Sequence, residues 1–77
     1  MTAKAFVLVE VMPGKVNEAV RSFGELGGKI KSVDRVSGPY DVIVVVEGQD
    51  LHDIGNFVTG RIHPMAIISR TVTCLVI

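Results

Sequence analysis

Residues 5–12 read AFVLVEVM, a run in which both sets of alternate positions carry apolar side chains. β-Branched and aromatic residues at this density are typical of a β-strand. Neighbouring side chains of a strand point to opposite faces of the sheet, so a sheet with one face in water should alternate apolar and polar residues. Only Glu10 interrupts this run. We therefore expect a sheet that needs apolar cover on both faces.

The residues after this strand predict a helix and then a hairpin. Pro13-Gly14 ends the strand, and Gly27-Gly28 closes the helix, since glycine accepts the left-handed conformation of a C-terminal cap. A second strand spans residues 30–36, a turn spans residues 37–39 and a third strand spans residues 40–47. The apolar face of the helix consists of Val16, Ala19, Val20, Phe23 and Leu26.

A second helix and a last strand complete the pattern. Asp50 is placed to cap the helix, Pro64 stops it, and residues 65–77 supply the strand. The apolar stripe of this helix consists of Leu51, Ile54, Phe57, Val58 and Ile62. The order βαββαβ predicts an α+β, ferredoxin-like sandwich, in which a four-stranded antiparallel sheet carries two helices on one face. We expect residues 1–77 to form one domain.

The face of the sheet without helices is also predicted to be apolar. Both sets of alternate positions are apolar in the later strands as well. In the third strand Val42, Val44 and Val46 alternate with Ile43 and Val45, and in the fourth Val72, Cys74 and Val76 stand against Ile67, Leu75 and Ile77. Full burial of a Val, Leu or Ile side chain contributes about 1.5–3 kcal/mol. Five or six such side chains left in water would therefore lose a burial free energy comparable with the net stability of a whole domain, which is about 5–15 kcal/mol. We therefore expect a dimer that pairs sheet to sheet. The alternative is a monomer whose apolar face is shielded by Lys, Arg and the chain ends.

Composition argues against several classes of function. Eight basic and eight acidic residues cancel without clustering, which argues against direct nucleic-acid binding. No signal peptide is recognisable, and the longest apolar run, residues 42–46, is too short to span a membrane. Cys74 has no disulfide partner, so we expect a reducing, cytoplasmic setting. His52 and His63 lie at opposite ends of the second helix, and we expect neither a metal nor a cofactor.

Three segments resemble one known family. The turn SGPYD at residues 37–41, the closing strand RTVTCLVI at residues 70–77 and the opening residues 7–14 are similar to the ligand-binding module of the Lrp/AsnC transcriptional regulators. The resemblance covers essentially the whole chain. It implies the same fold, pairing through the sheets into dimers and rings of dimers, and sensing of amino acids or related metabolites near the hairpin loop.

The resemblance also implies a role in transcriptional regulation. Full-length members carry a helix-turn-helix domain before this module. The expectation here is a stand-alone module without its own DNA-binding domain, which senses a metabolite or co-assembles with full-length relatives. A fragment of a longer regulator remains the alternative.

Candidate ligand-binding residues lie in the turn and the last strand. Gly38 exposes backbone N–H groups to a carboxylate, although Pro39 removes one donor. Asp41 could hold an ammonium group, and Tyr40 could wall the pocket. The threonines of the last strand, Thr71 and Thr73, could donate or accept hydrogen bonds. Each residue also has a purely structural explanation. Gly38 and Pro39 can simply form the turn, and the side chains of Tyr40 and Asp41 can fix the hairpin by a bond to the backbone. Thr71 and Thr73 can be ordinary strand residues.

Two other functions fit the same strand order. An ACT-like amino-acid-binding domain is compatible with residues 27–30, which read GGKI. A small dimeric ferredoxin-like enzyme, of monooxygenase or isomerase type, would need a general base or haem ligand, for which only Asp41, His52 and His63 are available. No catalytic triad or phosphate loop is recognisable, so we expect a binding module and not an enzyme.

Overall fold

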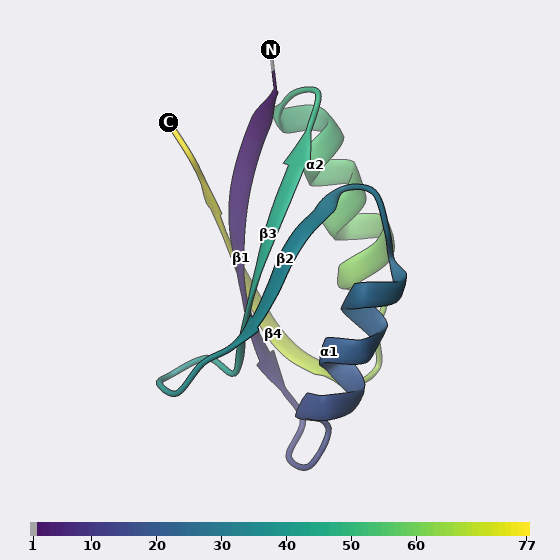
Figure 1. Ribbon diagram of the computed structural model, residues 1–77, viewed down its shortest axis with the longest axis vertical. Helices are drawn as coiled ribbons and strands as arrows, with labels where there is room; N and C mark the ends of the chain where they lie inside the picture. Colours follow the sequence, from purple (N-terminus) through teal and green to yellow (C-terminus); the bar gives the residue numbers. More distant parts are fainter. Residues whose placement is uncertain (1) are drawn as a thin grey trace.

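The computed structural model describes residues 2–77 and confirms the predicted order of elements. The strands are β1 (Ala3–Val11), β2 (Ile30–Arg35), β3 (Val42–Gly48) and β4 (Ile68–Leu75). The helices are α1 (Val16–Glu25) and α2 (Leu51–Phe57), and a π-helical turn, η1 (Val58–Ile62), continues α2. The antiparallel strands form one sheet in the order β2-β3-β1-β4, and both helices lie on the same side of it (Figure 1). This is the expected ferredoxin-like α+β fold.

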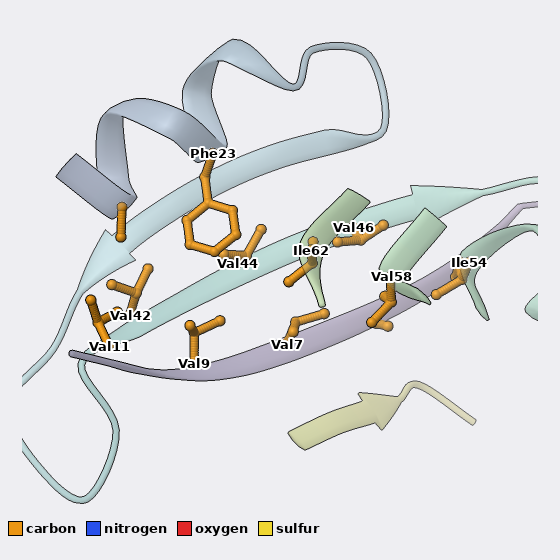
Figure 2. Close-up of a cluster of buried hydrophobic side chains, with 12 residues drawn as sticks. Val7, Val9, Val11, Phe23, Val42, Val44, Val46, Ile54, Val58 and Ile62 are labelled. Carbon is orange, nitrogen blue, oxygen red and sulfur yellow. The ribbon is translucent and has the colours of Figure 1, made fainter. Parts of the chain in front are cut away.

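The core lies between the sheet and the helices, as Figure 2 shows. Alternate valines of the two central strands point into it, with Val7 opposite Val44 and Val9 opposite Val42. Phe23 of α1 packs on them with no exposed surface. From α2 and η1 the buried side chains are Ile54, Val58 and Ile62. The buried residues at alternate positions of β1 and β3 therefore define the face of the sheet that the helices cover.

The second helix differs from the prediction in two ways. It does not continue as a regular α-helix to Ile62, because the N–H of His63 bonds to the Val58 carbonyl, five residues back, at 2.9 Å. Leu51, predicted to join the apolar stripe, is 54% exposed because it lies in the first turn, ahead of the buried positions. The predicted cap is confirmed, since Asp50 Oδ1 accepts the N–H of Asp53 at 2.8 Å.

The last strand is shorter than predicted. It begins at Ile68 and not at residue 65, because successive turns precede it: the N–H of Met65 bonds to the Ile62 carbonyl, and the N–H of Ile68 bonds to the Met65 carbonyl. The pairing of β1 with β4 is also irregular, with a register shift between Glu10 and Val11. From Glu10 to Val11 the partner in β4 steps from Arg70 to Ile68, so the extra residue of this β-bulge is Ser69 of β4.

The other side of the sheet, the open sheet face, has no helix over it. In the register, Phe6 lies between Val45 and Cys74, and Leu8 lies between Ile43 and Val72. Directly paired residues share a face of the sheet, so these six side chains form one apolar surface. None of them is buried, and Phe6 and Val72 are each 38% exposed. The sequence-based expectation of two apolar faces is confirmed.

Within residues 2–77, the helices are all too short or too polar to cross a lipid bilayer.

Candidate functional site

The turn between β2 and β3 forms the rim of a cavity. The N–H of Val36 bonds to the Asp41 carbonyl at 2.9 Å and closes the turn. Gly38 has φ +147°, a conformation that L side chains rarely adopt, so glycine is required at the tip. Figure 1 shows this loop reaching away from the side that carries the helices. The turn therefore overhangs one end of the open sheet face.

The cavity beneath the turn measures about 380 Å³. Gly38, Pro39 and Tyr40, three of the predicted ligand-binding residues, belong to its wall. Its floor is made of Leu8 and Ile43, which are members of the open sheet face. The remaining lining residues are Val36 and Ser37. The volume lies within the range of small-molecule sites, which are mostly apolar with a few polar groups. We call it the hairpin cavity.

Asp41 lies next to this cavity but has a structural partner. Its Oδ2 accepts the backbone N–H of Val11 at 2.8 Å, and its own N–H bonds to the Val9 carbonyl at 2.9 Å. The side chain is half-buried. Asp41 thus ties the hairpin to the end of β1, and its second carboxylate oxygen is the one left for a ligand.

Arg70 lies beside this site, although it is not among the ligand-binding residues predicted from the sequence. Its guanidinium carbon lies 5.2 Å from the centre of the Tyr40 ring, and its Nη2 lies 3.8 Å from Glu10 Oε2. Arg70 and Glu10 are paired in the register of β1 and β4. A cation and a carboxylate therefore stand side by side at the edge of the hairpin cavity. Only the register places them there, because 60 residues of sequence separate them.

The two threonines lie on the opposite face of the sheet. Thr71 pairs with Val9 and Thr73 with Val7, and both valines point into the helix-side core. Thr71 Oγ1 lies 2.8 Å from His63 Nε2. Thr73 lines a separate cavity of about 250 Å³ between α2, η1 and β4. Within one chain the structure brings together Gly38, Pro39, Tyr40 and Asp41 but does not bring the threonines to them.

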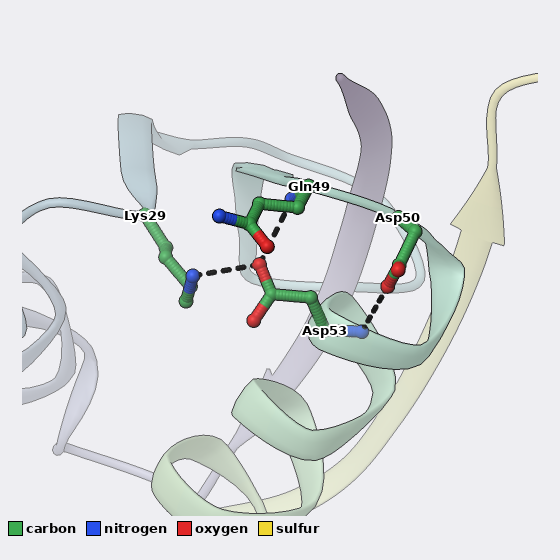
Figure 3. A network of polar contacts seen from close by, with 4 residues as sticks. All are labelled: Lys29, Gln49, Asp50 and Asp53. Carbon is green, nitrogen blue, oxygen red and sulfur yellow. Dashed lines mark hydrogen bonds and ion pairs between the residues drawn. The ribbon is translucent and has the colours of Figure 1, made fainter. Parts of the chain in front are cut away.

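A second polar cluster lies at the other end of the sheet (Figure 3). Asp53 Oδ2 accepts hydrogen bonds from Lys29 Nζ at 2.7 Å and from the N–H of Gln49 at 2.9 Å. The bond from Lys29, followed by the bond from Gln49, lowers the pKa of Asp53 below its ordinary value of 3.8. Gly48 makes room for this arrangement, because a Cβ there would lie 2.6 Å from Asp53 Oδ2. The cluster joins the start of β2 to the start of α2.

The side chains that could hold a metal ion are dispersed. Within the part of the chain that the structure describes, no three His, Cys, Asp or Glu side chains are grouped to hold a metal ion. Cys74 is exposed on the open sheet face beside Phe6. The hairpin cavity offers recognition through apolar walls and a few polar groups, with Arg70 and Glu10 at its edge.

The fold of this chain is shared with several solved structures, and one family model matches nearly all of it. The family described as Lrp/AsnC ligand binding domain matches residues 4–77. The crystal structure of FFRP-DM1 is 33% identical, with a TM-score of 0.91, and the match covers 97% of this chain and 99% of that one. The hypothetical protein PHS023 from Pyrococcus horikoshii is 34% identical, with a TM-score of 0.89, over 100% of this chain and 90% of the other.

A regulator with a longer chain shares the fold. The structure of AsnC from E. coli has a TM-score of 0.85 at 15% identity, and the match covers 97% of this chain but only 50% of AsnC. The chain therefore corresponds to about half the length of this regulator and to nearly the full length of FFRP-DM1.

Proposed function

Since the chain belongs to the family of the Lrp/AsnC ligand binding domain, we propose that it senses a small metabolite, in particular an amino acid, and forms oligomers in transcriptional regulation. The observation that carries this proposal is that the hairpin cavity shares Leu8 and Ile43 with the open sheet face. A second copy seated on that face would close the cavity. Effector binding and assembly would then use the same surface.

The open sheet face supports a homodimer. Six apolar side chains on each copy would lose their contact with water, at about 25 cal/mol for every Å² of apolar surface. This gain opposes an association cost of about 4–15 kcal/mol. A twofold axis uses the same patch on both subunits, so the buried area counts twice. Rings of dimers are the larger assembly that this proposal includes.

The residues at the hairpin cavity suit a free amino acid. The Arg70 guanidinium and the backbone N–H groups around Gly38 are donors for a carboxylate. The free oxygen of Asp41 and the carboxylate of Glu10 are acceptors for an ammonium group. Tyr40, Pro39 and the sheet residues provide walls for an apolar side chain. The transcriptional regulator NMB0573 from Neisseria meningitidis, solved as a complex with L-Met, has the same fold with a TM-score of 0.84 at 14% identity, over 97% of this chain and 49% of that one.

Thr71 and Thr73 enter this site only in an assembly. Because they lie on the helix side of β4, a site that combines them with Gly38 and Asp41 requires another copy of the chain. The proposal further includes a cytoplasmic location and co-assembly with full-length relatives of the same family.

A ligand-binding module is favoured over the enzyme alternative by the family match and by the site itself. His63 is engaged with Thr71 on the helix side, and Asp41 is engaged with Val11. The lining of the hairpin cavity is therefore mostly apolar and holds no histidine among the described residues, and the pair of Arg70 and Glu10 lies outside it, at its edge.

The proposal is tested by thermal unfolding in the presence of each proteinogenic amino acid. A ligand at a hundred times its dissociation constant adds about 2.7 kcal/mol to the free energy of unfolding, which gives a clear rise of the midpoint. The variant Arg70→Gln should lose that rise, while Arg21→Gln, on an exposed position of α1, should retain it. If no amino acid raises the midpoint of the wild-type protein, amino-acid sensing is wrong.

A further inference from the structure

A groove on the helix side, separate from the hairpin cavity, combines polar and apolar groups around an unpaired cation. It lies between the loop that joins α1 to β2 and the outer side of α2 and η1, and its volume is about 450 Å³. The residues from α2 and η1 recur at helical spacing and therefore face the same way. The lining consists of Leu26, Gly28, Lys29, Asp53, Asn56, Phe57, Gly60 and Arg61.

Two of the three charged side chains in this groove form an ion pair with each other, and the third, Arg61, does not join them. Lys29 and Asp53 neutralise each other at 2.7 Å, and Gln49 donates a further bond to the same oxygen of Asp53. Arg61 is exposed and forms no ion pair with any residue in the described part of the chain. The groove therefore presents one free guanidinium, whose planar donors bind carboxylates and phosphates in a bidentate manner.

Gly60 has no structural requirement that explains it. Its φ is not in the left-handed region, and a Cβ built on it would meet nothing within 4 Å. A glycine inside a helix is unfavourable compared with other residues. Gly60 lines the groove, so a larger side chain at this position would occupy the groove and not the core. The absence of a side chain at Gly60 therefore leaves space in the groove that a ligand can occupy.

The backbone at the groove is also unusual. Gly60 and Arg61 belong to the π-helical turn η1, which carries the i to i+5 bond from His63 to Val58. Such turns are rare and occur frequently at functional sites. Beside Arg61, the half-buried side chains of Leu26 and Phe57 offer an apolar wall.

We propose that this groove is a second small-molecule site, which takes an organic anion whose carboxylate or phosphate group pairs with Arg61 and whose apolar part lies on Leu26 and Phe57. The site is on the opposite face of the sheet from the hairpin cavity. It stands or falls independently of the proposed amino-acid sensing, because no residue is shared between the two linings.

The test is an NMR titration of the amide resonances with three probes: 3-phenylpropionate, phenyl phosphate and the neutral 3-phenylpropanol. The two anions should shift the amides of Gly28, Gly60 and Arg61 in a saturable manner, and the alcohol should not. Tighter binding of one anion identifies the headgroup as carboxylate or phosphate. The proposal is overturned if neither anion gives saturation, or if the shifts lie only around Gly38 and Tyr40.

Variants separate a binding role from a structural one. Arg61→Gln should weaken the affinity for the anions about tenfold or more through loss of the bidentate pair, while Arg21→Gln should leave it unchanged. Gly60→Leu should fill the groove and abolish binding, yet raise the thermal midpoint. The matched control is Gly24→Leu in α1, where a Cβ also meets nothing within 4 Å and which lines none of the cavities described above. Undiminished binding to folded Arg61→Gln or Gly60→Leu would overturn the proposal.

Discussion

The carboxylate of Asp41 accepts a hydrogen bond from the backbone N–H of Val11, 30 residues away, at 2.8 Å. Val11 is the last residue of β1, and Asp41 follows the turn between β2 and β3. The bond therefore fastens the loop that carries the hairpin cavity to a central strand of the sheet. A loop that is held in this way presents a preformed wall to a ligand.

Replacement of Asp41 tests this fastening. Asp41→Ala leaves the N–H of the buried Val11 without its acceptor, so the free energy of unfolding should fall by about 1–3 kcal/mol. Asp41→Asn keeps an acceptor oxygen and should lose less. Urea denaturation of both variants measures the difference. Equal stability of Asp41→Ala and the wild-type protein would show that the bond has no structural role.

Gly38 is expected to tolerate no side chain without strain. Its φ of +147° disfavours any L residue, while the space around it is open, so the penalty for Gly38→Ala comes from the backbone alone. We expect a loss of about 1–3 kcal/mol, measured by thermal unfolding. Gly24→Ala, at an exposed helical position, should instead stabilise the protein. A Gly38→Ala variant as stable as the wild type would contradict the conformation described for the turn.

The ion pair of Asp53 predicts a dependence of stability on acid pH. Lys29 and Gln49 lower the pKa of Asp53 in the folded protein below 3.8, so its contribution is complete above that pH and is lost as the pH falls through the folded-state pKa. Asp53→Asn should remove this part of the acid destabilisation. Thermal midpoints measured from pH 7 downward for both proteins give the comparison, with Glu25→Gln as the control. An identical pH profile for wild type and Asp53→Asn would contradict the assignment.

Most of the fold follows from local pattern. Apolar residues at both sets of alternate positions in β1 and β3 predict strands with two apolar faces, and Asp50 and Gly27 mark helix ends by their capping chemistry. The π-helical turn could not be predicted, because Ile54, Val58 and Ile62 have the spacing of a regular helix.

The site was only partly predictable, since it depends on register. The turn residues Gly38, Pro39 and Tyr40 are adjacent in sequence, and they line one cavity. The register of β4 against β1 decides that Arg70 joins them and that Thr71 and Thr73 face the helices. That register shifts at a bulge between Glu10 and Val11, for which the local sequence gives no signal.

The central claim is that a second copy of the chain covers the open sheet face. Sedimentation equilibrium at micromolar concentration measures it directly, together with Val45→Glu on that face and Thr59→Glu on the exposed side of η1 as the matched control. We expect the wild-type protein and Thr59→Glu to sediment at twice the chain mass of 8.3 kDa, or a multiple of that, and Val45→Glu to sediment as a folded single chain. A wild-type mass of one chain, or a Val45→Glu variant that assembles like the wild type, would contradict the claim.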